Sequence, residues 1–527
     1  SLPPHKRPKK WANIVDPVIP LKRNLYGHPL AGLYWEQFCT AELLNLGWQK
    51  VPGWECLFVH YKDKLFLSVY VDDFKMAGRA ESLAPMWKKI QAKLDLDPPT
   101  KMVDNVYLGC GQEDIEPDAK AVLEKGDLFK KCIDNTLSAE KPDGSDSPGQ
   151  PGAASTVRGE GSHQSSTGNN TRASAKARAK AKAQAKASNA AHKVKGWQYK
   201  MWGHAEQCVD RYLELAKKDI SSLKCVATPC IDDHLLNPED FVSKGELQSV
   251  CSKVVLKVLY LARQGRPDLL WSVNTLAREV TKWNVACDKR LHRLISYLHH
   301  TKDWTQWCWV GDEMKDCHLM MFTDASFAGD LKDSKSTSGT YLVVMGPNTF
   351  VPVSWFVKKQ GAVSHSSSEA EVIALDAAVR MEGIPALSLW ETVMLVFYPE
   401  KAKSCGKPQA LPKRDPILEI LLGVDYVPPS VPPSLGMAHL YVMEDNEAVI
   451  KMTIKGRSPN MRHVVRTQRV DLDWLFERIR VDPGVHMRYI GTKQQMADIM
   501  TKGSFTSTQW RDLCKLSNMG PKYPNKA

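Results

Sequence analysis

Two neighbouring carboxylates, Asp72 and Asp73, interrupt the apolar stretch LFLSVYVDDFKMAG at residues 65–78. A run rich in Val, Leu, Phe and Tyr with an abrupt polar pair predicts two strands joined by a tight turn. Adjacent acids repel each other, and a cation that prefers hard oxygen ligands, such as Mg²⁺, would relieve the repulsion. An exposed turn, where Asp is common, explains the pair equally well. This stretch alone leaves both interpretations open.

Four further acids lie far apart in the C-terminal part of the chain. The segment HLMMFTDASFAG predicts a strand with Asp324 toward its end, and AHLYVMEDNEAVIKMTI predicts a strand that ends at Asp445 and continues into a helix. SHSSSEAEVIALDAA predicts a helix that begins at serine caps, with Glu371 near its first turn. QQMADIMTKG predicts a last helix that carries Asp498. Acids are unfavourable in strands, so a purely structural role for Asp324 is the minor alternative.

The other three acids also have plainer explanations. Asp445 alone fits an ordinary helix N-cap, and Asp498 alone fits a solvated acid on a C-terminal helix. Glu369, two residues before Glu371, fits an acid that favours the helix dipole, and Glu444 immediately precedes Asp445. Each segment alone therefore leaves the role of its acid open. The four acids together, in this order of elements, indicate a shared site more specifically than any one of them does.

The order of predicted elements in residues 317–503 is βββαβαβα, which predicts a mixed five-stranded sheet with helices. Because the first three strands form a meander, the fourth should lie beside the first, with Asp324 and Asp445 as neighbours. Helices packed on the sheet would bring Glu371 and Asp498 to the same place. Four carboxylates that meet need cations, and two Mg²⁺ ions there suit phosphodiester hydrolysis.

The remaining chain predicts helices and a long polar segment. GELQSVCSKVVLKVLYLARQG and KRLHRLISYLHHTKDW have apolar residues at helical spacing. Residues 138–196 contain mainly Gly, Ser, Pro, Ala and Lys and should be disordered. The Pro-rich residues 399–437 should form a surface loop. The expected parts of this α/β chain are 1–137, 138–196, 197–310, 311–503 and a tail, 504–527.

Charge and composition restrict the class of protein. The formal net charge is +12, and no acid occurs between Gly161 and Ala205. A basic block attracts polyanions by counterion release, although a solvated linker explains it equally well. The candidate nucleic-acid contacts in this block are Lys176, Arg178, Lys180, Lys182 and Lys186. The sequence contains no run of about 18 uncharged apolar residues, so no membrane span is predicted. The thirteen cysteines lack a CxxC pair, which indicates reduced thiols in an intracellular protein, cytoplasmic or nuclear.

Four C-terminal segments resemble the ribonuclease H domain of copia-type retrotransposon polyproteins: TDASFAGDLKDSKSTSGTYLVVMG, SHSSSEAEVIALDAA, EDNEAV and GTKQQMADIMTKG. The resemblance implies a ribonuclease H-like fold with catalytic, metal-binding acids at Asp324, Glu371, Asp445 and Asp498. It selects Glu371 over Glu369, because the second Glu of E-A-E is the family's catalytic position. It also implies a pair of Mg²⁺ ions, for which Mn²⁺ is a substitute.

Differences from the family pattern are mild. Ser326 and Phe327 replace the usual Asp-Trp, and Val372 replaces Tyr. None of these differences removes a carboxylate.

The N-terminal part resembles the reverse transcriptase of the same family. LYGHPLAGLYWEQF is similar to the segment that precedes Y-V-D-D, VYLGC to the strand that follows it, and VLYLARQGRPDLLWSVNTLAR and LISYLHHTKDW to the helices before ribonuclease H. The resemblance implies an α+β palm fragment and thumb-like helices. Asp72 would be the direct catalytic metal ligand and Asp73 its neighbour, with Tyr26, His28 and Trp35 near the template–primer. A core position explains each of these three residues equally well, and it fits Trp35 better.

A polymerase palm also needs a carboxylate from an earlier strand. The only acid before Glu36 is Asp16, in NIVDPVIP, which does not resemble that strand. We therefore expect a truncated RNA-directed DNA polymerase that does not polymerise alone, completed by upstream Pol sequence or a second chain.

The expected activity is Mg²⁺-dependent ribonuclease H cleavage. The expected partners are an RNA–DNA hybrid, an RNA template and a DNA primer, with no membrane. The alternatives are a non-catalytic nucleic-acid-binding relic of a retroelement and an integrase or exonuclease with the same sheet. The integrase is disfavoured because it uses three acids.

Overall fold

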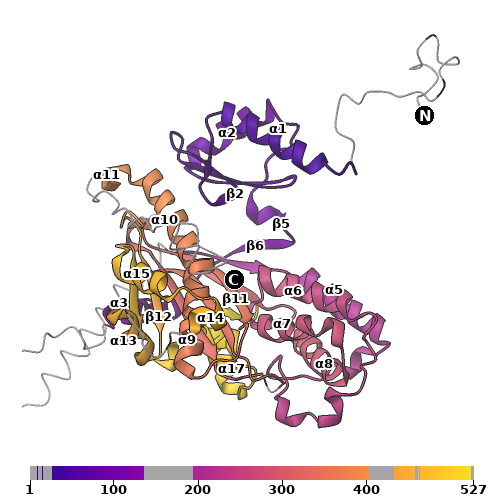
Figure 1. The fold of residues 1–527 in the computed structure, drawn as a ribbon. Coiled ribbons are helices and arrows are strands. Elements are labelled where there is room, and N and C mark those ends of the chain that lie inside the picture. The colour runs from indigo at the N-terminus through magenta and orange to yellow at the C-terminus, as the bar shows by residue number, and fades with distance from the viewer. Residues whose placement is uncertain are drawn as a thin grey trace, which may run out of the picture. The chain divides into compact units, whose positions relative to one another are not determined.

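The structure is a computed structural model that describes residues 9, 15, 27–135, 194–330, 332–402, 433–456, 461 and 463–523. The chain divides into two compact units, Ser1–Pro99 and Thr100–Ala527 (Figure 1). Each unit combines helices with its own sheet, so the α/β class predicted from the sequence is confirmed.

The first unit is a four-stranded antiparallel meander with two helices. Its elements are α1 (Ala31–Asn45), β1 (Gln49–Val51), β2 (Trp54–His60), β3 (Leu65–Tyr70), β4 (Asp73–Gly78) and α2 (Ala80–Gln91), and the strands follow the order β1-β2-β3-β4. Alternate residues of β3, Leu65 and Leu67, are fully buried. They share a core with Leu43 of α1 and with Met86 and Ile90 of α2. The period-two pattern of β3 thus places both helices on one face of the meander.

The second unit contains a ten-stranded mixed sheet. Its strands are β5 (Val106–Tyr107), β6 (Cys110–Ile115), β7 (Lys195–Lys200), β8 (Thr305–Val310), β9 (His318–Ser326), β10 (Thr337–Gly346), β11 (Thr349–Lys359), β12 (Leu440–Glu444), β13 (Val485–Tyr489) and β14 (Met519–Gly520). The order is β13-β12-β9-β10-β11-β8-β7-β6-β5, and β14 also pairs with β8. Strand β12 is parallel to both β9 and β13. The prediction that the fourth strand of the C-terminal part lies beside the first is confirmed.

The helices of the second unit come mainly from the segments between these strands. They are α3 (Ala119–Asp134), α5 (Trp202–Ala216), α6 (Cys251–Gln264), α7 (Leu270–Arg278), α8 (Val285–His300), α9 (Ser367–Ala378), α10 (Ile384–Phe397), α11 (Pro399–Ala402), α13 (Glu447–Lys455), α14 (Val464–Gln468), α15 (Leu472–Val481), α16 (Asp498–Thr501) and α17 (Ser507–Leu516). A π-helical turn, Val379–Gly383, joins α9 to α10.

Short 3-10 helices complete the connections. They are Met102–Asp104, Ile220–Ser222, Asp233–Leu235, Pro238–Phe241, Pro267–Leu269, Val280–Lys282, Met314–Asp316 and Thr492–Gln494.

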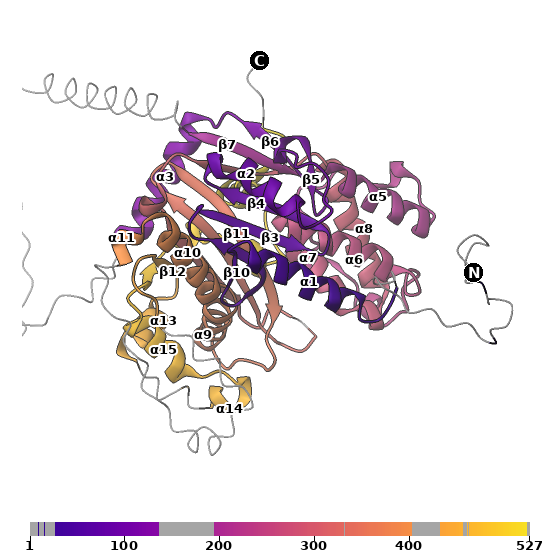
Figure 2. The same ribbon diagram turned by 90° about the horizontal axis from the view of Figure 1, so that it is seen from above.

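Strand β9 is buried on both faces of the sheet. Its side chains alternate, so that Leu319 and Met321 enter one core and Met320 and Phe322 enter the other. The first core also receives α9, α10, α13, α14 and α15 (Figures 1 and 2). The second core receives α3, α5–α8, α16 and α17. A strand covered on both faces needs a nearly continuous apolar run, which HLMMF supplies.

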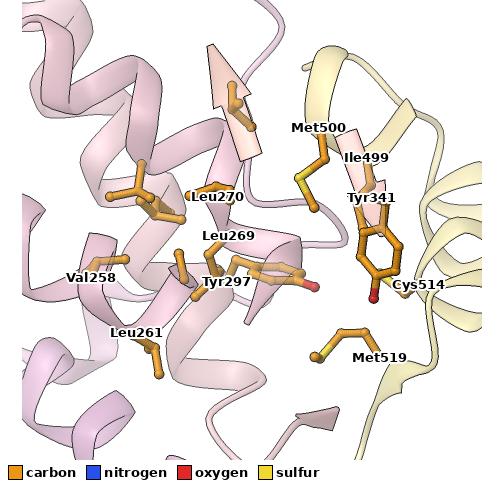
Figure 3. Packing of buried hydrophobic residues seen from close by; sticks show 14 of the residues in the cluster. Val258, Leu261, Leu269, Leu270, Tyr297, Tyr341, Ile499, Met500, Cys514 and Met519 are labelled. Carbon is orange, nitrogen blue, oxygen red and sulfur yellow. The ribbon is translucent and has the colours of Figure 1, made fainter. Parts of the chain in front are cut away.

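The helical region and the C-terminal segment share one core with the sheet. Figure 3 shows Leu270 and Tyr297 from α7 and α8 facing Met500, Cys514 and Met519 from the end of the chain. Residues 507–520 are therefore part of the second unit, whereas the sequence predicted a C-terminal tail over 504–527. The segment STQWRDLCKL carried the relevant signal, because its apolar residues recur at helical spacing behind a capping box.

The first boundary also differs from the expected one at residue 137. The first unit ends at Pro99, and β5, β6 and α3 belong to the second. Strand β6 pairs with β7, and β7 pairs with β8, so the region expected to be helical, 197–310, begins with a strand and ends with one. These pairings join segments far apart in the sequence, which local patterns do not reveal.

Several predictions fall partly or wholly outside the described residues. The expected linker 138–196 is described only from Val194, and the expected loop 399–437 only at its two ends. Among the described helices, none is long and apolar enough to cross a membrane.

Candidate active site

Three carboxylates from distant segments meet at the ends of β9 and β12. The parallel register pairs Met443 with Phe322, and continuing it by two residues sets Asp445 opposite Asp324. Glu371 of α9 reaches the same place. Oxygen atoms of Asp324, Glu371 and Asp445 lie within 4.8 Å of one another. The structure therefore brings together three of the four acids that the sequence singled out in this region.

Helix α9 reaches Asp324 because its contact face carries small residues. Ser366 caps the helix by accepting a hydrogen bond from the Glu369 backbone N–H at 3.1 Å, as the serine-rich segment predicted. Ala370 and Ala374 then pack on Ala325, the residue after Asp324. With only methyl groups between helix and strand, the helix lies close to the strand end.

The fourth acid, Asp498, is the first residue of α16 and is 9% exposed. Helix α16 lies against β10 at Gly339, which pairs with Asp324 across the β9–β10 ladder. A Cβ at position 339 would lie 2.5 Å from Cγ2 of Thr501 and 2.7 Å from Cβ of Met500. Only glycine permits this approach, which sets Asp498 beside the acid cluster.

Two further groups from the end of α16 bind the acids. The Thr501 hydroxyl donates a hydrogen bond to Oδ2 of Asp324. The Lys502 ammonium forms an ion pair with Asp498 and lies 3.7 Å from Oδ2 of Asp324. Lys502 thus connects Asp498 to the other acids and compensates part of their negative charge.

Burial and mutual repulsion disturb the protonation of these acids. Burial, together with the negative charges of Glu444, Asp324 and Asp445, raises the pKa of Glu371 to about 11. Burial and the charge of Asp324 raise the pKa of Asp498 to about 7, and the same two causes raise the pKa of Asp445. Without a cation, the cluster therefore retains protons at neutral pH.

The residues present fit divalent magnesium. The donor set consists of carboxylate oxygens, which Mg²⁺ prefers, and Oε2 of Glu371 is buried with no hydrogen-bond partner among the described residues. A divalent cation would provide that partner and offset the burial and the mutual repulsion that raise the pKa values of these carboxyls. Asp324, Glu371 and Asp445 would hold it, with Asp498 beside them.

The structure separates the two pairs of competing acids. Glu444 is fully buried, and its oxygens accept hydrogen bonds from the Thr323 hydroxyl and the Asn446 N–H, both at 3.1 Å. Glu369 points away from the cluster and accepts hydrogen bonds from His365 and His463. Asp445 and Glu371 are the members whose oxygens converge with Asp324.

The other predicted acid pair has a different setting. Asp72 and Asp73 lie at the turn of the β3–β4 hairpin, where Tyr70 pairs with Asp73, so the predicted strand–turn–strand is confirmed. Both acids are exposed. Val71 adopts a left-handed φ of 56° at the turn, and its carbonyl accepts a hydrogen bond from the Trp35 indole at 2.7 Å. Among the described residues, no group of three candidate metal ligands includes either acid.

The predicted nucleic-acid contacts are mostly outside the described residues. This holds for Tyr26 and for Lys176, Arg178, Lys180, Lys182 and Lys186. His28 is exposed near the start of α1, where its ring accepts a hydrogen bond from the Leu30 N–H at 3.2 Å and stacks on Tyr34.

Three residues of the acid site were not singled out from the sequence. Gly339, Thr501 and Lys502 act through packing, a hydrogen bond and an ion pair. Lys502 had a signal, because it lies four residues after Asp498 on a predicted helix. Gly339 lies in a segment that carries the family resemblance, but its packing role follows only from the contact of α16 with β10.

Comparisons with known proteins find retrotransposon polyproteins. The chain is 32% identical over 169 residues to a retrovirus-related Pol polyprotein from transposon RE2 of Arabidopsis thaliana, covering 30% of this chain and 10% of that protein. It is 29% identical over 181 residues to the retrovirus-related Pol polyprotein from transposon TNT 1-94 of Nicotiana tabacum, which covers 33% of this chain and 13% of that protein. It is 27% identical over 140 residues to the transposon Ty1-BR Gag-Pol polyprotein of Saccharomyces cerevisiae, which covers 26% of this chain and 8% of that protein.

No family model and no solved structure matches the chain. The chain spans about a tenth of the length of the curated relatives that it matches. Over about a quarter to a third of its own length, this chain is homologous to retrotransposon Pol polyproteins.

Proposed function

We propose that the second unit is a Mg²⁺-dependent ribonuclease H that cleaves the RNA strand of an RNA–DNA hybrid. The observation that carries this proposal is the convergence of Asp324, Glu371 and Asp445 within 4.8 Å, with Asp498 beside them. Homology to Pol polyproteins also supports the proposal, because the names of those relatives describe them as retrovirus-related polyproteins of transposons.

The residues of the site have separate tasks in this proposal. Asp324 and Asp445 are fixed by the β9–β12 ladder, and Glu371 is carried by the capped helix α9. Lys502 holds Asp498 next to Asp324. When bound, two Mg²⁺ ions (or Mn²⁺ in their place) would supply a hydroxide nucleophile and stabilise the leaving oxygen of a phosphodiester. The protein groups keep the four carboxylates in a fixed arrangement around that position.

The substrate class follows from the proposed activity. RNA in a hybrid differs from DNA by its 2′-hydroxyls and groove shape, so recognition does not require a base sequence. The basic segment with Lys176 and Arg178 would add sequence-independent attraction to phosphates.

For the first unit we propose a palm fragment that does not polymerise on its own. Asp72 and Asp73 would be its metal-site acids, but the described residues place no third ligand with them. A carboxylate from upstream Pol sequence or from a second chain would complete the site, which then takes an RNA template and a DNA primer.

The test is cleavage of an end-labelled RNA–DNA hybrid by the purified full chain with Mg²⁺, Mn²⁺ or a chelator. We expect RNA cleavage that needs the metal and is lost in Asp324→Asn. Asp473→Asn, a matched change of an exposed acid on α15, should cleave normally. Binding of the hybrid without cleavage by the native chain would contradict the proposal and favour the non-catalytic relic.

A further inference from the structure

A second cluster of metal-ligating side chains lies outside the acid site. His365 precedes the cap of α9, Glu369 is in the first turn of that helix, and His463 immediately precedes α14. Candidate ligand atoms of these three residues all lie within 4.8 Å of one another. Residues almost a hundred positions apart thus direct two imidazoles and one carboxylate to one point.

The distances within this cluster match a small coordination sphere. Oε2 of Glu369 lies 3.3 Å from Nδ1 of His365 and 3.1 Å from Nε2 of His463. Ligands about 2.0–2.1 Å from a tetrahedral zinc ion are about 3.3 Å from each other. The imidazole rings are nearly perpendicular, at 84°, with centroids 4.8 Å apart, so they converge edge-on and do not stack.

The carboxylate of Glu369 is buried and incompletely satisfied. Glu369 is 2% exposed, and its Oε1 atom has no hydrogen-bond partner among the described residues. Its Oε2 atom already accepts from the His365 backbone N–H at 2.9 Å. A buried carboxylate oxygen without a partner is unfavourable, and a cation bound by both oxygens of Glu369 would satisfy it.

The cluster is distinct from the acid site. Successive residues of a helix are about 100° apart, so Glu369 and Glu371 point about 200° apart around α9. The imidazoles face Glu369, and none contributes to the group of Asp324, Glu371 and Asp445. The side chain of His365 is 71% exposed and that of His463 is 39% exposed, which leaves a solvent path to the cluster.

We propose that His365, Glu369 and His463 bind one Zn²⁺ ion. Two imidazoles with one carboxylate form a ligand set for zinc, whereas Mg²⁺ prefers oxygen ligands, so the two clusters should select different metals. Water from the exposed side would fill the fourth position. The ion would connect α14 to the first turn of α9, the helix that carries Glu371 (Figures 1 and 2).

The experiment uses the full chain purified without a histidine tag and stripped with a chelator. After equilibration with ZnCl₂ and dialysis, metal content is measured by mass spectrometry, and CoCl₂ is titrated in a parallel absorption experiment. We expect one Zn²⁺ per native chain, none in His463→Ala, and a Co²⁺ spectrum without thiolate bands. Zinc should also raise the melting temperature of the native chain but not of His463→Ala.

Three variants make the result decisive. Asp324→Asn/Asp445→Asn removes candidate ligands of the acid site and should still bind one zinc. His439→Ala, which changes a histidine that is hydrogen-bonded to His486, should also still bind one zinc. If His463→Ala does not fold, the exposed His365→Asn replaces it and should also lose zinc. The proposal would be overturned by equal zinc in the native chain and in His463→Ala or His365→Asn, by loss of zinc in the acid-site variant, or by thiolate bands.

Discussion

The chain places acids at the ends of strands in two regions, and only one of them forms a cluster. In the first unit, Asp72 and Asp73 are adjacent in the sequence, exposed, and located at a hairpin turn. In the second unit, Asp324 and Asp445 are far apart in the sequence but opposite each other on parallel strands. The second arrangement raises carboxyl pKa values, as Asp445 shows.

The difference shows that acids far apart in the sequence converge and are buried together on paired strands, whereas two adjacent acids at a turn stay exposed. Neighbouring residues in a strand point to opposite faces, so two consecutive acids cannot both face one ion from within a strand. A parallel strand pair places residues of equal register side by side, and helices add ligands from either face. The first unit has a turn in place of such a pair.

The largest effect is expected where a buried cation loses its acid partner. Arg266 and Asp268 are 2% and 1% exposed and bonded at 2.8 Å, with the Tyr297 hydroxyl also donating to Asp268. Asp268→Ala should lower the free energy of unfolding by about 3–5 kcal/mol, because it leaves a buried guanidinium. Asp72→Ala should change it by no more than about 0.5 kcal/mol. Urea denaturation measures the free energy of unfolding of both variants. Equal losses of stability would show that burial does not distinguish the two acids.

The two acid regions should differ in catalysis almost as strongly. Asp324→Asn should reduce hybrid cleavage roughly 10²–10³-fold, the range associated with one electrostatic group at a reaction centre. Asp72→Asn/Asp73→Asn should leave the rate unchanged. Rates are measured on a labelled hybrid with saturating Mg²⁺, and circular dichroism checks folding. A hairpin variant as inactive as Asp324→Asn would contradict the separation of the two regions.

A single methyl group should disturb the convergence in the second unit. Gly339→Ala places a Cβ 2.5 Å from Thr501, so α16 must move away from β10 and carry Asp498 with it. We expect a destabilisation of about 1–3 kcal/mol and slower cleavage. Gly361→Ala, which meets no atom within 4 Å, is the matched control. Normal cleavage by Gly339→Ala would show that the position of α16 is unimportant.

The smallest effect concerns partly buried histidines, which carry a positive charge when protonated. Burial, followed by the neighbouring His439, lowers the pKa values of His318 and His486 to about 4. Below pH 6.5 the unfolded chain therefore binds more protons than the folded one, and stability falls as the pH decreases toward 4. Thermal melts across this range should show a shallower decline in His486→Gln. If the melting temperature fell equally with pH in the native chain and in His486→Gln, protonation of His486 would not be a cause of the decline.

Much of the acid site could be predicted from sequence because its elements are regular. The meander, the parallel pairing of β12 with β9 and the serine cap of α9 follow from residue patterns. The choice between Glu369 and Glu371 required the family resemblance, and in the structure it is Glu371 whose oxygens lie near those of Asp324 and Asp445. Three other features depend on tertiary packing, which leaves no periodic signal in the sequence. They are the pairing of β7 with β6 and β8, the contact of Gly339 with α16, and the histidine partners of Glu369.

The short contact between β8 and β11 has a practical consequence. Phe350 of β11 pairs with Trp309 of β8, and both side chains are fully buried. A chain shortened to residues 311–527 would lose β8 and expose the backbone edge of β11 next to a bare aromatic surface. Such edges recruit strands from other molecules, so that truncated product should precipitate where the longer chain stays dispersed.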